Sequence, residues 1–257
     1  MAPDVLQSRR TLLLAAGLLP LPAAAAEEAA GSLLSLFGGS GDRVEGSGKV
    51  VDDERSVAGF TKVIVNGPLD VRIAAGDADH VVVHADDNIA PLVDTSVLGT
   101  TLVIGLKSGA SFRTRSKMQV RVQAARLQGV TLRGSGDIRV DRVDSDIFEA
   151  TLQGSGDVVV DALRADTVAV SIAGNGDIRA RGTAGTLGVV IDGKVDVHFA
   201  DLVARTVAVA IRGSGDARVH ATDELQVSIG GSGDVRYRGT PKITKAISGS
   251  GSVEPLR

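Results

Sequence analysis

Apolar side chains alternate with polar ones on both sides of a glycine-rich turn that recurs through the second half of the chain. The turn is written GSGD at four places there and GNGD at a fifth. Aliphatic residues stand two and four positions before most turns and four and six positions after them, which predicts two short strands per repeat. The first turn glycine recurs at spacings of 18 to 20 residues, at Gly134, Gly154, Gly174, Gly193, Gly213, Gly231 and Gly249.

The repeat length predicts how these strands pack. One unit cannot cover the inward side chains of its own strands, but stacked units can, at the ~4.8 Å spacing of paired strands. We therefore predict an all-β fold, a parallel β-helix (solenoid) with coils of 18 to 20 residues over 129–257. An antiparallel meander competes, but it would not return the same residue class to the same offset in every unit. A third inward column is predicted at the next corner, at Val143, Leu163, Thr183, Leu202, Thr222 and Thr240.

The segment 49–128 carries a looser version of the same pattern. The stretch FTKVIVNGPLDVRI, residues 60–73, repeats the later units position by position around Gly67. Because a terminal coil needs a cover, we expect this N-terminal β segment to add an antiparallel elaboration or cap. A hairpin is expected at the LGTT that starts at Leu98. Further strands are predicted at 80–85, 92–98, 101–106 and 118–124.

Residues 1–26 are predicted to be an export signal peptide. Arg9 and Arg10 precede an apolar run that ends in small residues near Ala26, which is a twin-arginine-like pattern. The run is shorter than the ~20 apolar residues that cross a bilayer, and we expect no membrane span in the mature chain. Residues 27–48 are rich in Gly and Ser and are predicted to be a linker. The expected location is exported, in the periplasm or on the surface of a bacterium.

Composition narrows the classes of function. The 257 residues carry a formal net charge of −3, and only 2% of them are aromatic. Nucleic-acid binding needs basic clusters and stacking rings, so no nucleic-acid partner is expected. The absence of cysteine excludes disulfides and thiolate metal sites. No cofactor is expected.

The order of these elements resembles a known family. The stretches FTKVIVNGPLDVRI, HVVVHADDNIAPLV, TLVIGLKSG and KMQVRV are followed by LQGVTLRGSGDIRV and further GSGD turns. This succession is similar to the putative auto-transporter adhesin head GIN domain family over about residues 57–253. The resemblance implies an exported bacterial β-helical domain of unknown function, whose family name suggests surface adhesion. It brings no catalytic residues.

Stacking is expected to place the turn aspartates in one column on the outside of the solenoid. Two unit charges one strand spacing apart repel by about 0.9 kcal/mol in water and about 3.5 kcal/mol at an effective dielectric constant of 20. Backbone amides of the turn can offset this repulsion, at glycines that permit positive φ. Arginines two positions further on can offset it as well. These arginines are Arg139, Arg179, Arg218 and Arg236.

Calcium is the alternative for this column, because carboxylates are hard-oxygen ligands. The repeat length argues against it, since calcium-binding β-helix repeats recur about every nine residues. A calcium site would use Asp137, Asp157, Asp177, Asp196, Asp216 and Asp234.

Catalysis has little support in the sequence. The histidines His80, His84, His198 and His220 are too far apart to form one site, and the Asp and Arg residues recur in unit after unit. We predict no catalytic residues and a non-enzymatic structural or adhesion-like module of the cell envelope. A calcium-dependent binding module and a carbohydrate-active β-helix enzyme are the alternatives. The expected partner is an envelope or surface protein or polysaccharide, with a second copy of the chain as a further candidate.

Overall fold

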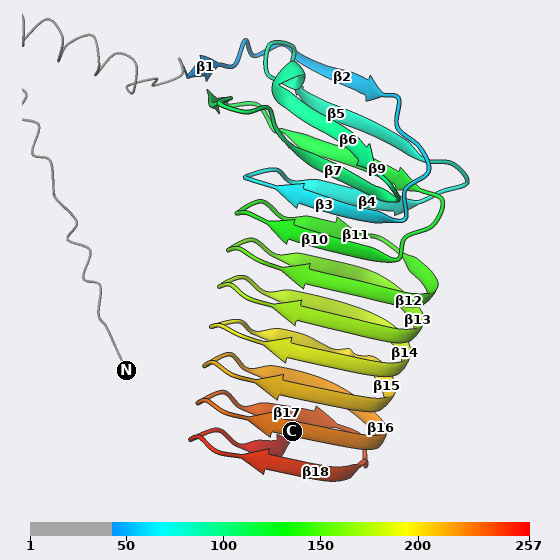
Figure 1. Ribbon diagram of the computed structural model, residues 1–257, viewed down its shortest axis with the longest axis vertical. Coiled ribbons are helices and arrows are strands. Elements are labelled where there is room, and N and C mark those ends of the chain that lie inside the picture. The colour runs from blue at the N-terminus through cyan, green and yellow to red at the C-terminus, as the bar shows by residue number, and fades with distance from the viewer. Residues whose placement is uncertain (1–42) are drawn as a thin grey trace, which may run out of the picture. The chain divides into compact units, whose positions relative to one another are not determined.

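Successive coils of the chain stack along the long axis of the molecule (Figure 1). The computed structural model describes residues 43–257, so the predicted signal peptide and most of the predicted linker lie outside it. The helical element of this part is one 3₁₀ turn, η1 (Ala90–Leu92). Residues 43–257 hold no helix with the length and hydrophobicity that a membrane crossing requires.

Strands make up most of the described chain. Those of the N-terminal part are β1 (Val44–Glu45), β2 (Val50–Arg55), β3 (Lys62–Asn66), β4 (Val71–Ala75), β5 (His80–Asp86), β6 (Val93–Leu98), β7 (Thr101–Leu106), β8 (Phe112–Arg113) and β9 (Gln119–Ala124). Those of the repeat part are β10 (Gly129–Arg133), β11 (Ile138–Val140), β12 (Val143–Leu152), β13 (Val158–Ile172), β14 (Ile178–Ile191), β15 (Val197–Ile211), β16 (Ala217–Ile229), β17 (Val235–Arg238), β18 (Lys242–Ile247) and β19 (Val253–Pro255).

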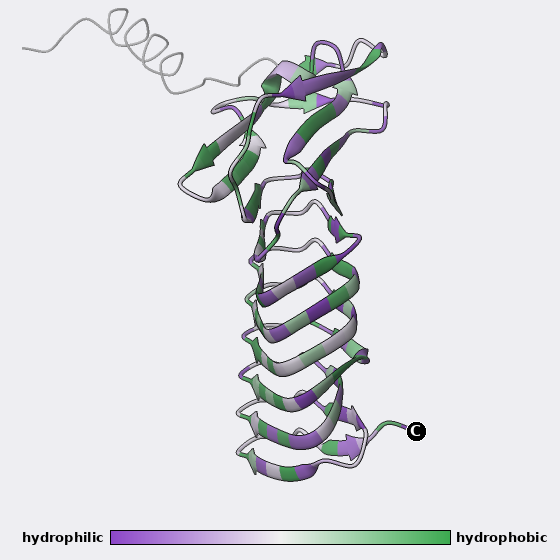
Figure 2. Cartoon of the chain, turned by 90° about the vertical axis from the view of Figure 1, so that its right-hand side faces the viewer, coloured by the Kyte–Doolittle hydropathy of each residue, from purple (hydrophilic) through white to green (hydrophobic). Residues whose placement is uncertain are grey.

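Strands of neighbouring coils pair in parallel and in register, which confirms the predicted solenoid. Leu132 lies opposite Leu152, and Leu152 lies opposite Ile172. The column continues through Ile191, Ile211 and Ile229, and all of these side chains are buried. Hydrophobic and hydrophilic residues alternate along the stacked ribbons (Figure 2). Each coil therefore covers the inward side chains of the next.

Two sides of the solenoid meet at the repeated turn. The pre-turn side consists of β3, β10, the last residues of β12 to β16, and β18. The post-turn side consists of β4, β11, the first residues of β13 to β16, β17 and β19. The turns lie one above another along the left side of the solenoid in Figure 1.

The N-terminal strands form the expected cap. β3 and β4 make a first coil, in which Val63 lies opposite Val130 and Val71 lies opposite Ile138. Beyond this coil, β7 pairs in parallel with β3, and β9 with β4. The pairs β2–β5, β5–β9 and β6–β7 are antiparallel, and the last of these confirms the predicted hairpin. The parallel strands β7 and β9 therefore cover the apolar end of the stack, and β2, β5 and β6 add antiparallel strands beyond them.

The predicted corner column is only partly right. Leu163 is buried as expected, but the residue opposite it is Gly182 and not Thr183, which is exposed. Gly182 takes a φ of 133°, and a Cβ there would collide with the backbone of Leu163. Thr222 and Thr240 are exposed as well. The prediction is wrong for Thr183 and Thr222 because the pairing register shifts at the corner between coils. It is wrong for Thr240 because this residue lies between β17 and β18, outside the paired strands.

Candidate functional site

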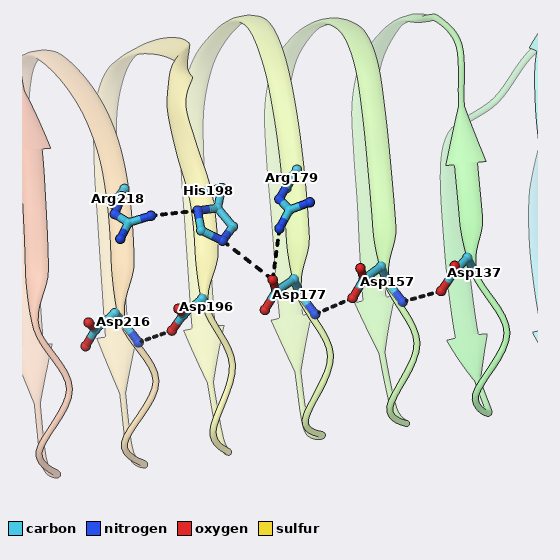
Figure 3. A network of polar contacts seen from close by, with 8 residues as sticks. All are labelled: Asp137, Asp157, Asp177, Arg179, Asp196, His198, Asp216 and Arg218. Atoms are coloured by element: carbon cyan, nitrogen blue, oxygen red, sulfur yellow. Dashed lines mark hydrogen bonds and ion pairs between the residues drawn. The ribbon is translucent and has the colours of Figure 1, made fainter.

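The turn aspartates form a hydrogen-bonded ladder on the outside of the solenoid (Figure 3). The Oδ1 atom of Asp137 accepts the backbone N–H of Asp157 at 2.9 Å, and Asp157 accepts that of Asp177 at 2.9 Å. Each such carboxylate holds the next coil in register, and the amide dipole offsets the repulsion between stacked charges. The same bond runs from Asp137 to Asp70, from Asp216 to Asp196, from Asp234 to Asp216 and from Ser252 to Asp234.

The turn glycines are required by close packing and not by a left-handed backbone. The GSGD glycines do not take positive φ, so that expectation is wrong for these turns. A Cβ on Gly154 or Gly156 would lie closer than 3.0 Å to the carbonyl oxygen of Gly134 or Gly136 in the preceding coil. Only a hydrogen atom fits where the backbones approach this closely.

One turn departs from the glycine pattern. Val195 stands where the other turns have their second glycine, and it is buried. There the N–H of Lys194 lies 3.4 Å from the carbonyl oxygen of the preceding coil, whereas the equivalent bonds of the other turns measure 2.9 or 3.0 Å. Figure 3 shows the ladder interrupted between Asp177 and Asp196 at the same turn. A side chain at the glycine position therefore opens the stack locally.

Arginines compensate the column at two of the four predicted positions. Arg179 Nη2 lies 3.1 Å from Asp177 Oδ2, and Arg236 Nη2 lies 3.9 Å from Asp234 Oδ2. All four side chains remain at least one-third exposed, so these pairs add little stability.

The other two predicted pairs are not formed. Arg139 Nη2 lies 2.7 Å from Oδ2 of Asp161. Arg218 Nη1 lies 3.1 Å from Nδ1 of His198, and Nε2 of His198 lies 3.6 Å from Asp177 Oδ2. The prediction of a regular arginine column is wrong at Arg139 and Arg218, because these long side chains reach partners outside their own turn. The backbone ladder supplies the regular compensation instead.

The aspartate column contains no preformed metal site. Within 43–257, no group of three or more His, Cys, Asp or Glu side chains is placed to hold a metal ion. Most column carboxylates already use one oxygen to accept an amide N–H. Calcium binding by Asp137, Asp157, Asp177, Asp196, Asp216 and Asp234 stays a prediction that this geometry does not favour.

The cap carries a charged cluster that links β2, β5 and β9. Nδ1 of His84 and Nη2 of Arg121 each lie 2.6 Å from Oδ1 of Asp52. The hydrogen bonds from His84 and then from Arg121 lower the pKa of Asp52. His80 faces Glu54 instead, at 3.9 Å, so the two histidines of β5 belong to separate ion pairs. These solvent-accessible pairs tie β2, β5 and β9 together.

A buried carboxylate in the cap was not found by reasoning from the sequence. Asp86 is 1% exposed, and its two oxygens accept the hydroxyl protons of Thr114 and Ser116, each at 2.6 Å. These hydrogen bonds lower the pKa of Asp86. The contact fixes the segment after β8 onto the end of β5. No spacing in the sequence connects these residues, since 28 positions separate Asp86 from Thr114.

The middle of the outer surface on the pre-turn side holds a shallow groove of about 620 Å³. Charged residues of this surface, such as Arg212 and Lys242, lie outside the lining of the groove. The lining comes from six neighbouring strands: β12 gives Glu149 and Thr151 at one end, and β13 to β16 and β18 form the floor with mostly small side chains. The one ionisable residue that lines it is Glu149 at one end, which pairs with Lys62 at 2.6 Å. The outward residues of the floor are Ala169, Ser171, Gly188, Val190, Ala208, Ala210, Gln226, Ser228, Thr244 and Ala246.

The outer surface of the post-turn side is different. Its outward positions, two residues after the turn aspartates, carry mostly cationic residues and histidine. They are Arg139, Val159, Arg179, His198, Arg218 and Arg236. The sequence predicted the arginines of the post-turn side, but the uncharged outward residues of the pre-turn side were not predicted, although they alternate with the inward columns in the same strands. The uncharged groove, formed by the ten outward residues, is the candidate contact surface.

Comparisons with known proteins agree with this architecture. The family model described as putative auto-transporter adhesin, head GIN domain, matches residues 59–241. A putative adhesin from Bacteroides fragilis NCTC 9343 has a TM-score of 0.80 and 22% identity, covering 83% of this chain and 100% of its own. A putative adhesin from Parabacteroides distasonis ATCC 8503 has a TM-score of 0.66 and 27% identity, covering 84% and 100%.

A third similar structure carries a different functional name. It is a putative lipid binding protein from Parabacteroides distasonis ATCC 8503, with a TM-score of 0.68 and 24% identity, covering 84% of this chain and 100% of its own. No curated protein matches this chain. At such identities the structural likeness shows the fold.

Proposed function

Since the chain belongs to the head GIN domain family of putative auto-transporter adhesins, we propose that it is a non-enzymatic binding module of the bacterial envelope. Its contact surface is the uncharged groove on the pre-turn side. The observation that carries the proposal is that the ten outward residues which β13 to β16 and β18 contribute to this groove carry no charge, with Glu149 of β12 at one end. With 23% charged residues overall, about two of those ten would be charged by composition alone, and outward positions favour charge further.

The lack of charged side chains favours association, because a partner can cover the groove without the free-energy cost of desolvating charged groups. The stacked backbone also favours it, because strands paired in register leave the floor little freedom to lose on binding. The floor has no Trp, Tyr or Arg, the residues that dominate tight interfaces. We therefore expect each contact to be weak, with adhesion arising from many copies acting together.

The partner that fits is an uncharged surface exposed in the envelope, on a polysaccharide or a protein. An exported location accords with the adhesin family and with the predicted signal at residues 1–26. A lipid ligand, suggested by the name of one structural neighbour, would use the same groove and is a separate outcome of the test.

The test places one negative charge on each side of the solenoid in turn. Ala208→Glu puts a carboxylate in the middle of the groove, and Val159→Glu puts one on the post-turn side between Arg139 and Arg179. Labelled protein starting at Glu27 is titrated onto envelope fractions of the source bacterium, untreated, treated with protease or oxidised with periodate. We expect Ala208→Glu to weaken binding at least about tenfold, and Val159→Glu to bind as the unchanged protein does.

The two treatments identify the partner, because protease removes a protein and periodate removes a polysaccharide. Equal binding by Ala208→Glu and the unchanged protein would eliminate the groove as the contact surface. If the protein binds neutral lipid vesicles, and its binding to envelope fractions is unaffected by protease and by periodate, the groove binds lipid and not a protein or a polysaccharide.

A further inference from the structure

The last coil leaves one edge of the solenoid open. All six residues of β18 are exposed, and this strand pairs with β16 alone in the described chain. In the same way, β19 pairs only with β17. The opposite end of the stack is covered by the cap (Figure 1). An open edge with unpaired N–H and C=O groups is a template on which another chain can add a strand.

Lys245 breaks the inward pattern of this coil. The pairing register places it opposite Val227, so its side chain leaves the strand on the inward side. The inward neighbours Ile243 and Ile247 stay apolar and are each 38% exposed. No ion pair within 43–257 involves Lys245. The residues at this position in the preceding coils are Val130, Ala150, Val170, Val189, Val209 and Val227.

A strand that paired with the open edge of β18 would bury the Lys245 ammonium group between Ile243 and Ile247. Burial of an unpaired charge is strongly unfavourable, so such a strand does not pack. Two copies that met at this end about a twofold axis would bring both Lys245 side chains into the same junction. Pro255 in β19 adds to the barrier, because proline has no N–H to offer a neighbouring strand.

We propose that Lys245 prevents a second copy of this chain from docking end to end on the last coil. Its ammonium keeps Ile243 and Ile247 from serving as an association surface. The inference is independent of the partner in the groove. It removes one of the surfaces through which the chain could form homo-oligomers.

The experiment replaces one lysine on each face of β18. Lys245→Val restores the residue of the preceding coils, whereas Lys242→Val removes an equal charge from the outward face. Sedimentation velocity measures association of the protein starting at Glu27 over a hundredfold range of about micromolar concentrations. We expect Lys245→Val to dimerise at least about tenfold more tightly than the unchanged protein, with Lys242→Val unaffected.

Three results would overturn the inference. They are a Lys245→Val variant that stays monomeric while folded, a Lys242→Val variant that associates to the same extent, and an unchanged protein that already pairs through this end. Circular dichroism verifies the fold of each variant. Lys245→Ala, which matches Ala150 in the stack, is the second variant and is expected to associate in the same direction but more weakly.

Discussion

The second glycine of the turn offers a sharp test of the packing argument. Alanine at Gly156 adds one Cβ, which would lie closer than 3.0 Å to the carbonyl oxygen of Gly136 and 3.1 Å from a methyl group of Leu132. The backbone φ needs no change, because Gly156 is not in the left-handed region. Any loss of stability therefore measures the close approach of the two coils.

The turn with Val195 shows the scale of the loss. With a side chain at that position, the backbone contact lengthens from 2.9 or 3.0 Å to 3.4 Å, and one rung of the aspartate ladder is missing. A lost hydrogen bond costs about 0.5–1.5 kcal/mol, and overpacking in a tight site costs about 1–3 kcal/mol. We expect Gly156→Ala to lower the free energy of unfolding by about 1–3 kcal/mol. For a domain of this size, that lowers the thermal midpoint by roughly 2–12 °C.

Gly188→Ala is the matched control. A Cβ at Gly188 would point into the uncharged groove, with one atom within reach at 4.0 Å. Loss of backbone freedom in the unfolded chain should then stabilise the protein by about 0.4–1 kcal/mol. Thermal unfolding followed by circular dichroism compares the two variants under identical conditions. The reasoning is refuted if Gly156→Ala unfolds at the midpoint of the unchanged protein, or if Gly188→Ala is destabilised as much.

Three further predictions follow from the polar contacts. Asp157→Ala removes the acceptor for the N–H of Asp177 and should lower the free energy of unfolding by about 1–3 kcal/mol. Asp157→Asn keeps an acceptor oxygen and should change that free energy by less than about 0.5 kcal/mol. Urea unfolding of both variants measures the difference. The pKa of Asp87, whose carboxylate accepts the Ser47 hydroxyl proton at 2.6 Å, is lowered from 3.8 mainly by that hydrogen bond, as the pKa values of Asp52 and Asp86 are by theirs. The stabilisation from these three carboxylates is complete above pH 3.8 and is lost as the pH falls below it, so a thermal midpoint unchanged down to about pH 2 would contradict this. Millimolar calcium should leave the midpoint unchanged, and an increase that a chelator reverses would restore the calcium hypothesis.

The inward columns were predictable because their physical cause acts locally and repeats. Leu152 and Ile172 occupy the same offset from their turns, and burial of one face of a strand requires that alternation. The hairpin at Leu98 was predictable for the same reason, since its turn residues lie between two alternating runs. The corner column was not predictable in the same way. Gly182 and Thr183 both lie about one coil length after Leu163, and only the pairing register shows that Gly182 is opposite Leu163.

The repeat in the sequence is enough to specify the stack, because a periodicity of 18 to 20 residues leaves apolar strands that only neighbouring coils can cover. It also specifies the column of turn aspartates, whose spacing follows from the coil length. The contacts of those aspartates depend on the folded arrangement of the coils. The partner of each charged side chain depends on which groups of neighbouring coils come within about 3 Å of it. Arg139, for example, contacts Asp161, and Arg218 contacts His198. The uncharged groove likewise exists only once outward residues from five strands lie side by side.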